Sequence, residues 1–277
     1  MEKLKVGIQL YTLRDQTEKD LVGTLQTVKK IGYDYVEYAG YFGYSAADLK
    51  KLTEDCGLIG ISTHYGLDNF KNPDTFDANV AYQKELGVKY VAIPWMDKME
   101  GLAGGEEALA KTAELMTKTA IALKKNGMQL LYHNHDFEFE PVGDKLPIDA
   151  LYEAVPELMP EFDTCWVKYA GYDPVEYINK YSGRTPVIHL KDFVGKKGST
   201  QVYALVDKDG NPVGGDNSDV SAFAFRSVGS GIQNFPAIIR AGIASGAEAI
   251  IVEQDDCYGD SFGAAEASRA YLKSIGF

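Results

Sequence analysis

The 277-residue sequence is poor in the residues that mark several specialised classes of protein. Its three cysteines are odd in number and far apart, which argues against a disulfide framework and against a structural zinc held by thiolates. No apolar run approaches the roughly 20 residues of a membrane span. The N-terminus leads directly into a strand-like pattern without a signal peptide, although a trimmed leader would look the same. We therefore expect a cytoplasmic protein with no membrane partner.

Dense basic runs are also lacking. The formal net charge is -12, and the Lys pairs at 29–30 and 124–125 fall late in helix-like stretches, where cations suit the helix dipole. A phosphate backbone would be repelled by such a surface, so we expect no nucleic-acid partner. The expected partner is a small molecule, and a homo-oligomer is compatible with the sequence.

Short β-branched runs alternate with longer amphipathic segments along the whole chain. Strands are predicted at residues 6–12, 35–39, 60–64, 90–94, 129–134, 162–167, 186–191 and 249–254. Helices are predicted at residues 19–31, 45–56, 73–87, 106–125, 147–155, from 173, 236–244 and 264–275. Strict alternation implies parallel strands with right-handed crossovers, and eight repeats predict a single-domain α/β protein, a (β/α)8 TIM barrel over residues 1–277. A doubly wound sheet is the alternative, but the first predicted turn, 10–14, contains no glycine.

An insertion of about residues 194–234 breaks this rhythm after the seventh predicted strand. Asp209-Gly210 lies between apolar runs and predicts a hairpin there. Because the insertion follows a strand end, it hangs over the face where barrels carry their active sites. A lid or substrate loop and a decorative hairpin are equally compatible with this pattern.

All four histidines lie at the C-terminal ends of predicted strands, where a barrel builds its active site. They are His64 after the third strand, His133 and His135 after the fifth, and His189 in the seventh. Asp163 and Glu253 add carboxylates in the sixth and eighth. Imidazole and carboxylate ligands suit Mn²⁺, Co²⁺, Zn²⁺ or Mg²⁺, although a single histidine is more often structural than functional.

Several segments, in order along nearly the whole chain, resemble the xylose-isomerase-like superfamily of sugar isomerases and epimerases, whose members include ketose 3-epimerases, inosose dehydratases and endonuclease IV. The segments are Gly7–Thr12, Tyr132–Phe139, Gly183–Arg184, His189–Asp192, Val228–Gly231 and Val252–Asp255. The resemblance implies a metal site of Glu, Asp, His and Glu from the last four strands. The last three carry over to Asp163, His189 and Glu253. His133 stands where many members have the first Glu, so the implied ligands are His133, Asp163, His189 and Glu253.

This departure bears on the reaction that the resemblance implies. In the epimerases two metal-bound glutamates exchange a proton on opposite faces of the substrate carbon, and here only Glu253 remains of that pair. The other acid–base candidates are His135, Glu138 and Lys191. One base and one acid are enough for isomerisation or for β-elimination next to a carbonyl.

Substrate contacts are expected from polar and aromatic side chains on or after the strands. The candidates are Gln9, Tyr11, His64, Trp95 and Trp166, with Glu37 as a further polar group on the second strand. Layer packing inside the barrel is the competing interpretation for each of them. Asp136 and Asp192 are candidates for orienting the ligands. A phosphate group would have only Arg184, Lys191, Arg226 and the Gly229–Gly231 turn as candidates.

The leading hypothesis is a divalent-metal-dependent isomerase or epimerase that transfers a proton next to a carbonyl of a sugar or sugar derivative. One alternative is a dehydratase or lyase acting on a keto-sugar, keto-glycoside or keto-inositol. Another is a non-catalytic carbohydrate-binding barrel. A DNA-repair endonuclease of the same superfamily is disfavoured by the charge of -12 and by the presence of only four histidines.

Overall fold

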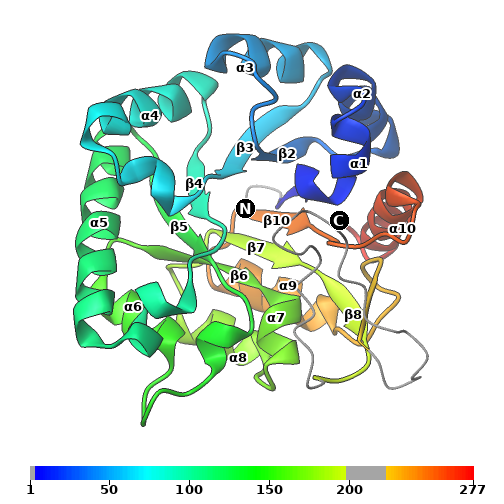
Figure 1. Cartoon of the computed structure of the whole chain (residues 1–277). Coiled ribbons are helices and arrows are strands. Elements are labelled where there is room, and N and C mark those ends of the chain that lie inside the picture. Colours follow the sequence, from blue (N-terminus) through cyan, green and yellow to red (C-terminus); the bar gives the residue numbers. More distant parts are fainter. Residues whose placement is uncertain (1–3, 198–222) are drawn as a thin grey trace.

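The structure is a computed structural model that describes residues 4–197 and 223–277. Within them eight parallel strands close into a barrel in the order β1, β10, β7, β6, β5, β4, β3 and β2, with helices around it (Figure 1). These strands are β1 Lys5–Gln9, β2 Tyr35–Ala39, β3 Ile59–His64, β4 Tyr90–Ile93, β5 Gln129–His133, β6 Met159–Asp163, β7 Val187–Leu190 and β10 Ala249–Val252. The predicted (β/α)8 barrel is therefore confirmed.

The eight predicted helices lie close to their predicted positions because the chain carries clear start and stop signals, whereas α1 and α7 were not predicted. The α-helices are α1 Arg14–Thr17, α2 Leu21–Ile31, α3 Ala46–Asp55, α4 Pro73–Leu86, α5 Glu106–Lys125, α6 Pro147–Ala154, α7 Thr164–Tyr169, α8 Pro174–Lys180, α9 Phe235–Ala244 and α10 Ser261–Ser274. The Ser45 side chain accepts the Asp48 N–H at the start of α3, and Gly32, at φ 109°, ends α2. No helix among the described residues is both long and apolar enough to cross a membrane.

Two predicted strands run too far toward their C-terminal ends. The first was expected to reach residue 12, but β1 ends at Gln9, whose side chain accepts the Tyr11 N–H and starts the 3-10 turn η1, Leu10–Leu13. The sixth was expected at 162–167, but β6 ends at Asp163. The Asp163 Oδ1 atom accepts the N–H groups of Cys165 and Trp166, so the chain enters α7 instead.

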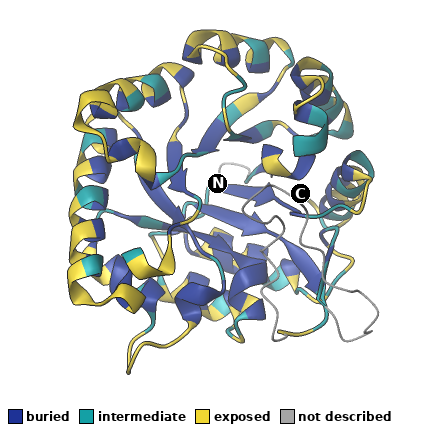
Figure 2. Ribbon diagram, viewed as in Figure 1, coloured by how far each residue is buried: buried dark blue, intermediate teal, exposed yellow. Residues whose placement is uncertain are grey.

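The barrel interior is apolar at one end and polar at the other. Its apolar layer lies toward the N-terminal ends of the strands and consists of Ile61, Tyr90, Ala92, Leu131, Val187, Ala249 and Ile251. A second and larger core fills the space between strands and helices, so the strands are buried on both faces while the helices expose their outer sides (Figure 2). Toward the C-terminal ends the interior side chains are polar and buried. That end of the barrel holds the candidate site.

The two ends of the predicted insertion are tied together. Strand β8, Asp192–Val194, pairs antiparallel with β9, Ala224–Arg226. The Asp192 carboxylate also accepts backbone N–H groups of Gly229, Gly231 and Gln233 at 3.0, 2.8 and 3.2 Å. The hairpin predicted at residues 209–210 lies outside the described residues.

Candidate metal centre

The four histidines lie where the sequence placed them. His64 and His133 are the last residues of β3 and β5, His189 lies in β7, and His135 follows β5 by two positions. The rings of His64 and His189 are nearly parallel, with centroids 5.3 Å apart, and the His133 ring stands edge-on to both. The histidines thus gather inside the C-terminal mouth of the barrel.

The four residues predicted to bind metal come together. One donor atom from each of His133, Asp163, His189 and Glu253 can be chosen so that all lie within 4.8 Å of one another. The His189 Nδ1 atom is 3.0 Å from Glu253 Oε2, and His133 Nε2 is 3.3 Å from Asp163 Oδ2. All four residues are buried. Both ring nitrogens of His133 lack a hydrogen-bond partner among the described residues. Unpartnered imidazole nitrogens beside two carboxylates fit a divalent cation such as Zn²⁺, Mn²⁺ or Co²⁺.

Lys191 brings a cation to the same carboxylates. Its Nζ atom lies 2.8 Å from Asp163 Oδ2, 2.9 Å from Glu253 Oε2 and 2.9 Å from Asp255 Oδ1. Burial opposes the charge on Lys191, but these three carboxylates outweigh it and raise the pKa of the ammonium well above its ordinary value. Without a bound ion Lys191 is therefore protonated, so it can neutralise negative charge.

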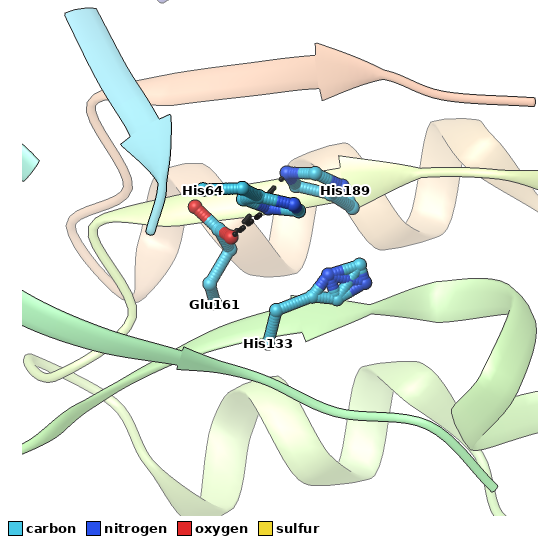
Figure 3. Close-up of side chains that lie close together, drawn as sticks. All are labelled: His64, His133, Glu161 and His189. Atoms are coloured by element: carbon cyan, nitrogen blue, oxygen red, sulfur yellow. Dashed lines mark hydrogen bonds and ion pairs between the residues drawn. The ribbon is translucent and has the colours of Figure 1, made fainter. Parts of the chain in front are cut away.

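Two carboxylates outside the predicted ligand set approach the histidines of the cluster. Glu161 lies in β6 and Glu37 in β2, and both are fully buried. Glu161 Oε2 is 3.0 Å from His64 Nε2 and 3.5 Å from His189 Nε2 (Figure 3). Strand periodicity could have found Glu161, because side chains two apart in a strand share a face and Asp163 was already placed inside. Glu37 was expected only as a possible substrate contact.

Charge pairs set the protonation of this inner group. Burial alone would raise the pKa of Glu37, but His64 and His189 outweigh it and hold the pKa well below its ordinary range. Burial also opposes the charge on His64, yet Glu37 and Glu161 raise its pKa to about 10. Burial, followed by the charge of Glu37, raises the pKa of Glu161 to about 7. Without a bound ion, protonated imidazoles therefore neutralise these carboxylates.

The pKa values of His133 and His135, the outer histidines, are lowered instead of raised. Burial, and then the neighbouring His64 and His189, hold the pKa of His133 well below its ordinary value. Burial, followed by Lys191, lowers the pKa of His135 to about 3. Both rings are therefore neutral near pH 7, as a metal ligand or a general base must be.

The other candidate site residues divide into buried and exposed groups. Gln9 donates from Nε2 to Glu37 Oε1 at 2.7 Å, so it borders the cluster. Glu138 accepts the Tyr132 hydroxyl at 2.5 Å and the His135 N–H at 2.8 Å, so it fixes the loop that carries His135. Trp166 is buried in α7, 5.3 Å from the Lys191 Nζ atom.

Two predicted aromatic contacts lie near the surface. Trp95 is 50% exposed, with its ring 6.5 Å from that of Phe137, and Tyr11 is 39% exposed beneath the Arg14 guanidinium. Aromatic rings this accessible suit contact with a sugar ring more than layer packing inside the barrel.

The groups considered for phosphate binding are already engaged. The N–H groups of Gly229 and Gly231 donate to Asp192, and Arg184 donates to the Pro156 and Leu158 carbonyls. Arg226 donates from Nη1 to the Phe225 carbonyl. Lys191 is held by the three carboxylates. The described part of the chain therefore presents no ready anion cradle from these groups.

The fold agrees with the family to which the sequence belongs. A family model described as xylose isomerase-like TIM barrel matches residues 25–275, so the chain is a member of that family. It is 26% identical over 200 residues to an inosose dehydratase of Geobacillus kaustophilus, a match that covers 65% of this chain and 64% of that enzyme, less than two thirds of its length.

Solved structures share the fold over the whole chain. A sugar phosphate isomerase/epimerase from Parabacteroides distasonis has a TM-score of 0.77 at 23% identity, covering 100% of this chain and 96% of that one. An L-ribulose 3-epimerase has a TM-score of 0.67 at 16% identity, covering 98% and 94%. At these identities the likeness establishes the fold, and the chemistry has to be argued from the residues.

Proposed function

We propose that this protein is a divalent-metal-dependent enzyme that moves a proton next to a carbonyl group of a sugar or sugar derivative. The observation that carries the proposal is the buried quartet of His133, Asp163, His189 and Glu253 at the barrel mouth, with the Lys191 ammonium beside it. These four residues would hold the ion. A bound divalent ion acts as a Lewis acid that polarises the substrate carbonyl.

The remaining groups have complementary roles in this proposal. His135 is neutral and offers an unprotonated ring nitrogen to accept the proton from the carbon next to the carbonyl. Lys191 remains a cation and stabilises the negative charge that develops on the substrate oxygen. Glu138 positions His135 through the backbone N–H. Trp95 and Tyr11, both accessible, contact the sugar.

Hydrogen exchange with solvent tests this proposal. The protein is loaded with Mn²⁺, Co²⁺ or Zn²⁺ and incubated in D₂O with a panel of keto-sugars and keto-inositols. We expect deuterium in the recovered substrate or in an isomer, and loss of exchange after chelation. No incorporation with any of these compounds would contradict the proposal and would favour a carbohydrate-binding barrel without catalysis.

A dehydratase is the second candidate, and the match to an inosose dehydratase favours it. One base and one acid are sufficient for β-elimination, and the quartet contains a single glutamate, which suits elimination better than two-faced epimerisation. The same incubation separates the two reactions. Loss of 18 mass units, roughly one water, from the product indicates a dehydratase, whereas deuterium in a product of unchanged composition indicates an isomerase or epimerase.

A further inference from the structure

The polar cluster continues below the predicted metal quartet. Glu37 Oε1 lies 3.0 Å from His64 Nε2 and 2.7 Å from His189 Nε2. Glu161 Oε2 lies 3.0 Å and 3.5 Å from the same two nitrogens. These four side chains come from four different strands, and Figure 3 shows Glu161 directed at both His64 and His189.

The carboxylate–imidazole distances among these four atoms are close to those between ligands in a metal coordination shell. Tetrahedral ligands about 2.1 Å from Zn²⁺ lie roughly 3.4 Å from one another. The four carboxylate–imidazole separations here run from 2.7 to 3.5 Å. Two imidazoles and two carboxylates are also a donor set that suits Zn²⁺ or Co²⁺.

Unpartnered atoms point to a missing ligand. His189 is completely buried, and its Nε2 atom makes no well-directed hydrogen bond to any described residue, although Glu37 Oε1 is only 2.7 Å away. Glu161 Oε1 is likewise buried without a partner in the described part of the chain. Buried polar atoms are almost always satisfied, and an ion bound by His189 Nε2 and the Glu161 carboxylate would supply such a partner.

The charge of the whole cluster accommodates two ions. A neutral imidazole has only one unprotonated nitrogen, so His189 binds two ions as an imidazolate. With His64 and His133 neutral, five buried carboxylates and this ring face one buried ammonium, that of Lys191, which leaves a net charge of -5. Two divalent cations reduce that charge to -1 in a region with little access to solvent. The five carboxylates are Glu37, Glu161, Asp163, Glu253 and Asp255.

We propose that Glu37, His64, Glu161 and His189 form a second divalent-cation site beside the predicted quartet. His189 belongs to both sites, because its Nδ1 atom faces Glu253 at 3.0 Å while Nε2 faces Glu37. Gln9 Nε2 and Ser62 Oγ donate to the two oxygens of Glu37 at 2.7 and 2.5 Å, which fixes the orientation of that ligand. The inner ion holds the barrel mouth together, and the outer ion remains open to substrate.

Metal content is the deciding measurement, because two imidazolium protons could supply the same charge to the inner site. Chelator-treated protein is dialysed against Co²⁺ and the bound ions are counted by plasma mass spectrometry. We expect two ions per chain in the wild type and one in each of Glu37→Gln, Glu161→Gln and Asp163→Asn. Glu138→Gln removes a buried carboxylate outside both sites and should keep two.

Spectroscopy of the same samples tests the shared ligand. Two Co²⁺ ions bridged by the imidazolate of His189 should be magnetically coupled in the wild type, and Glu161→Gln should abolish the coupling while the visible bands of one ion remain. Circular dichroism confirms that each variant is folded. If a variant fails to fold, the number of ions bound by the wild type decides whether a second ion is present.

A wild-type protein that binds one ion overturns the two-ion arrangement. If that ion is lost in Asp163→Asn and kept in Glu161→Gln, the outer quartet and the proposed function stand while the second site fails. A count of two that neither Glu37→Gln nor Glu161→Gln reduces would equally overturn the assignment to these residues.

Discussion

The ammonium of Lys191 lies 2.9 Å from Oε2 of Glu253, a carboxylate expected to bind a divalent ion. The same ammonium is 2.8 Å from Asp163 Oδ2, so it shares two of the four ligands of the quartet. Asp255, 2.9 Å away on the other side, can retain the ammonium when an ion takes the other two carboxylates. Lys191 and the ion therefore compete for the same charge.

Replacing Lys191 by Met removes the ammonium and leaves the metal ion as the only cation at these carboxylates. Without an ion, the variant leaves three buried carboxylates without their common counter-charge, and breaking a buried ion pair in this way costs about 3–5 kcal/mol. The free energy of unfolding of the metal-free variant should fall by that order in urea. The affinity for Co²⁺ should rise, because the competing ammonium is gone.

Addition of Co²⁺ provides the control for this prediction. It should stabilise Lys191→Met more than the wild type, since binding to the folded state alone adds to stability. Equal stabilisation of both proteins would mean that Lys191 and the ion do not share ligands.

Asp163 caps a helix and is a predicted metal ligand, and two variants distinguish these roles. Its Oδ1 atom caps α7 through the N–H groups of Cys165 and Trp166, while Oδ2 faces Lys191 and His133. Asn can still cap the helix, whereas Ala cannot. Both variants should lose binding at the outer site. Asp163→Ala should be less stable than Asp163→Asn by about 1 kcal/mol.

Urea unfolding of the chelator-treated variants measures that difference. Equal unfolding midpoints would show that the cap contributes nothing to α7. Retention of two ions by Asp163→Asn would remove Asp163 from the ligand set.

The barrel could be predicted from the sequence because its signals are local. Each strand is a short apolar run, and the helices begin at capping residues such as Ser45 and end at glycines such as Gly32. The polar mouth of the barrel could be predicted from the residues at the ends of the strands alone. The segment at 164–167 was mispredicted because Thr, Cys, Trp and Val favour strands, while the cap formed by Asp163 starts a helix there.

The arrangement inside the mouth could not be predicted in the same way. The approach of Lys191 to Asp163 and Glu253 depends on the register between three strands that are distant in sequence. Glu161 was not predicted as a site residue, although it pairs with His133 between strands β5 and β6. Pairings of this kind appear only when the barrel closes.

Asp192 should hold the end of the insertion in place. Its Oδ2 atom accepts the N–H groups of Gly229 and Gly231 at 3.0 and 2.8 Å. In Asp192→Asn an amide that donates would face two donors, so we expect a loss of about 2–3 kcal/mol in the free energy of unfolding. Asp173→Asn is the matched control, because Asn caps α8 as well as Asp does. Equal urea midpoints for the two variants would contradict this role.

Glu138 should make stability fall as the pH rises. Burial raises its pKa from 4.5 to about 7, although the Tyr132 hydroxyl donates to it. Below about pH 4.5 the carboxyl is protonated in both the folded and the unfolded chain, and nothing is lost. Between 4.5 and 7 the unfolded chain releases the proton while the folded one keeps it, so stability declines by up to about 3 kcal/mol and then levels off.

Glu138→Gln removes this titration and keeps an oxygen for the His135 N–H and a donor for the Tyr132 oxygen. The stability of the variant relative to wild type should therefore increase steadily from pH 4.5 to about 7. Urea unfolding across this range measures it, with the exposed Glu140→Gln as a control for general charge effects. If the difference in unfolding free energy between Glu138→Gln and wild type stays constant with pH, this carboxyl is not held protonated in the folded chain. A carboxyl with a raised pKa in the folded state must make that difference change with pH.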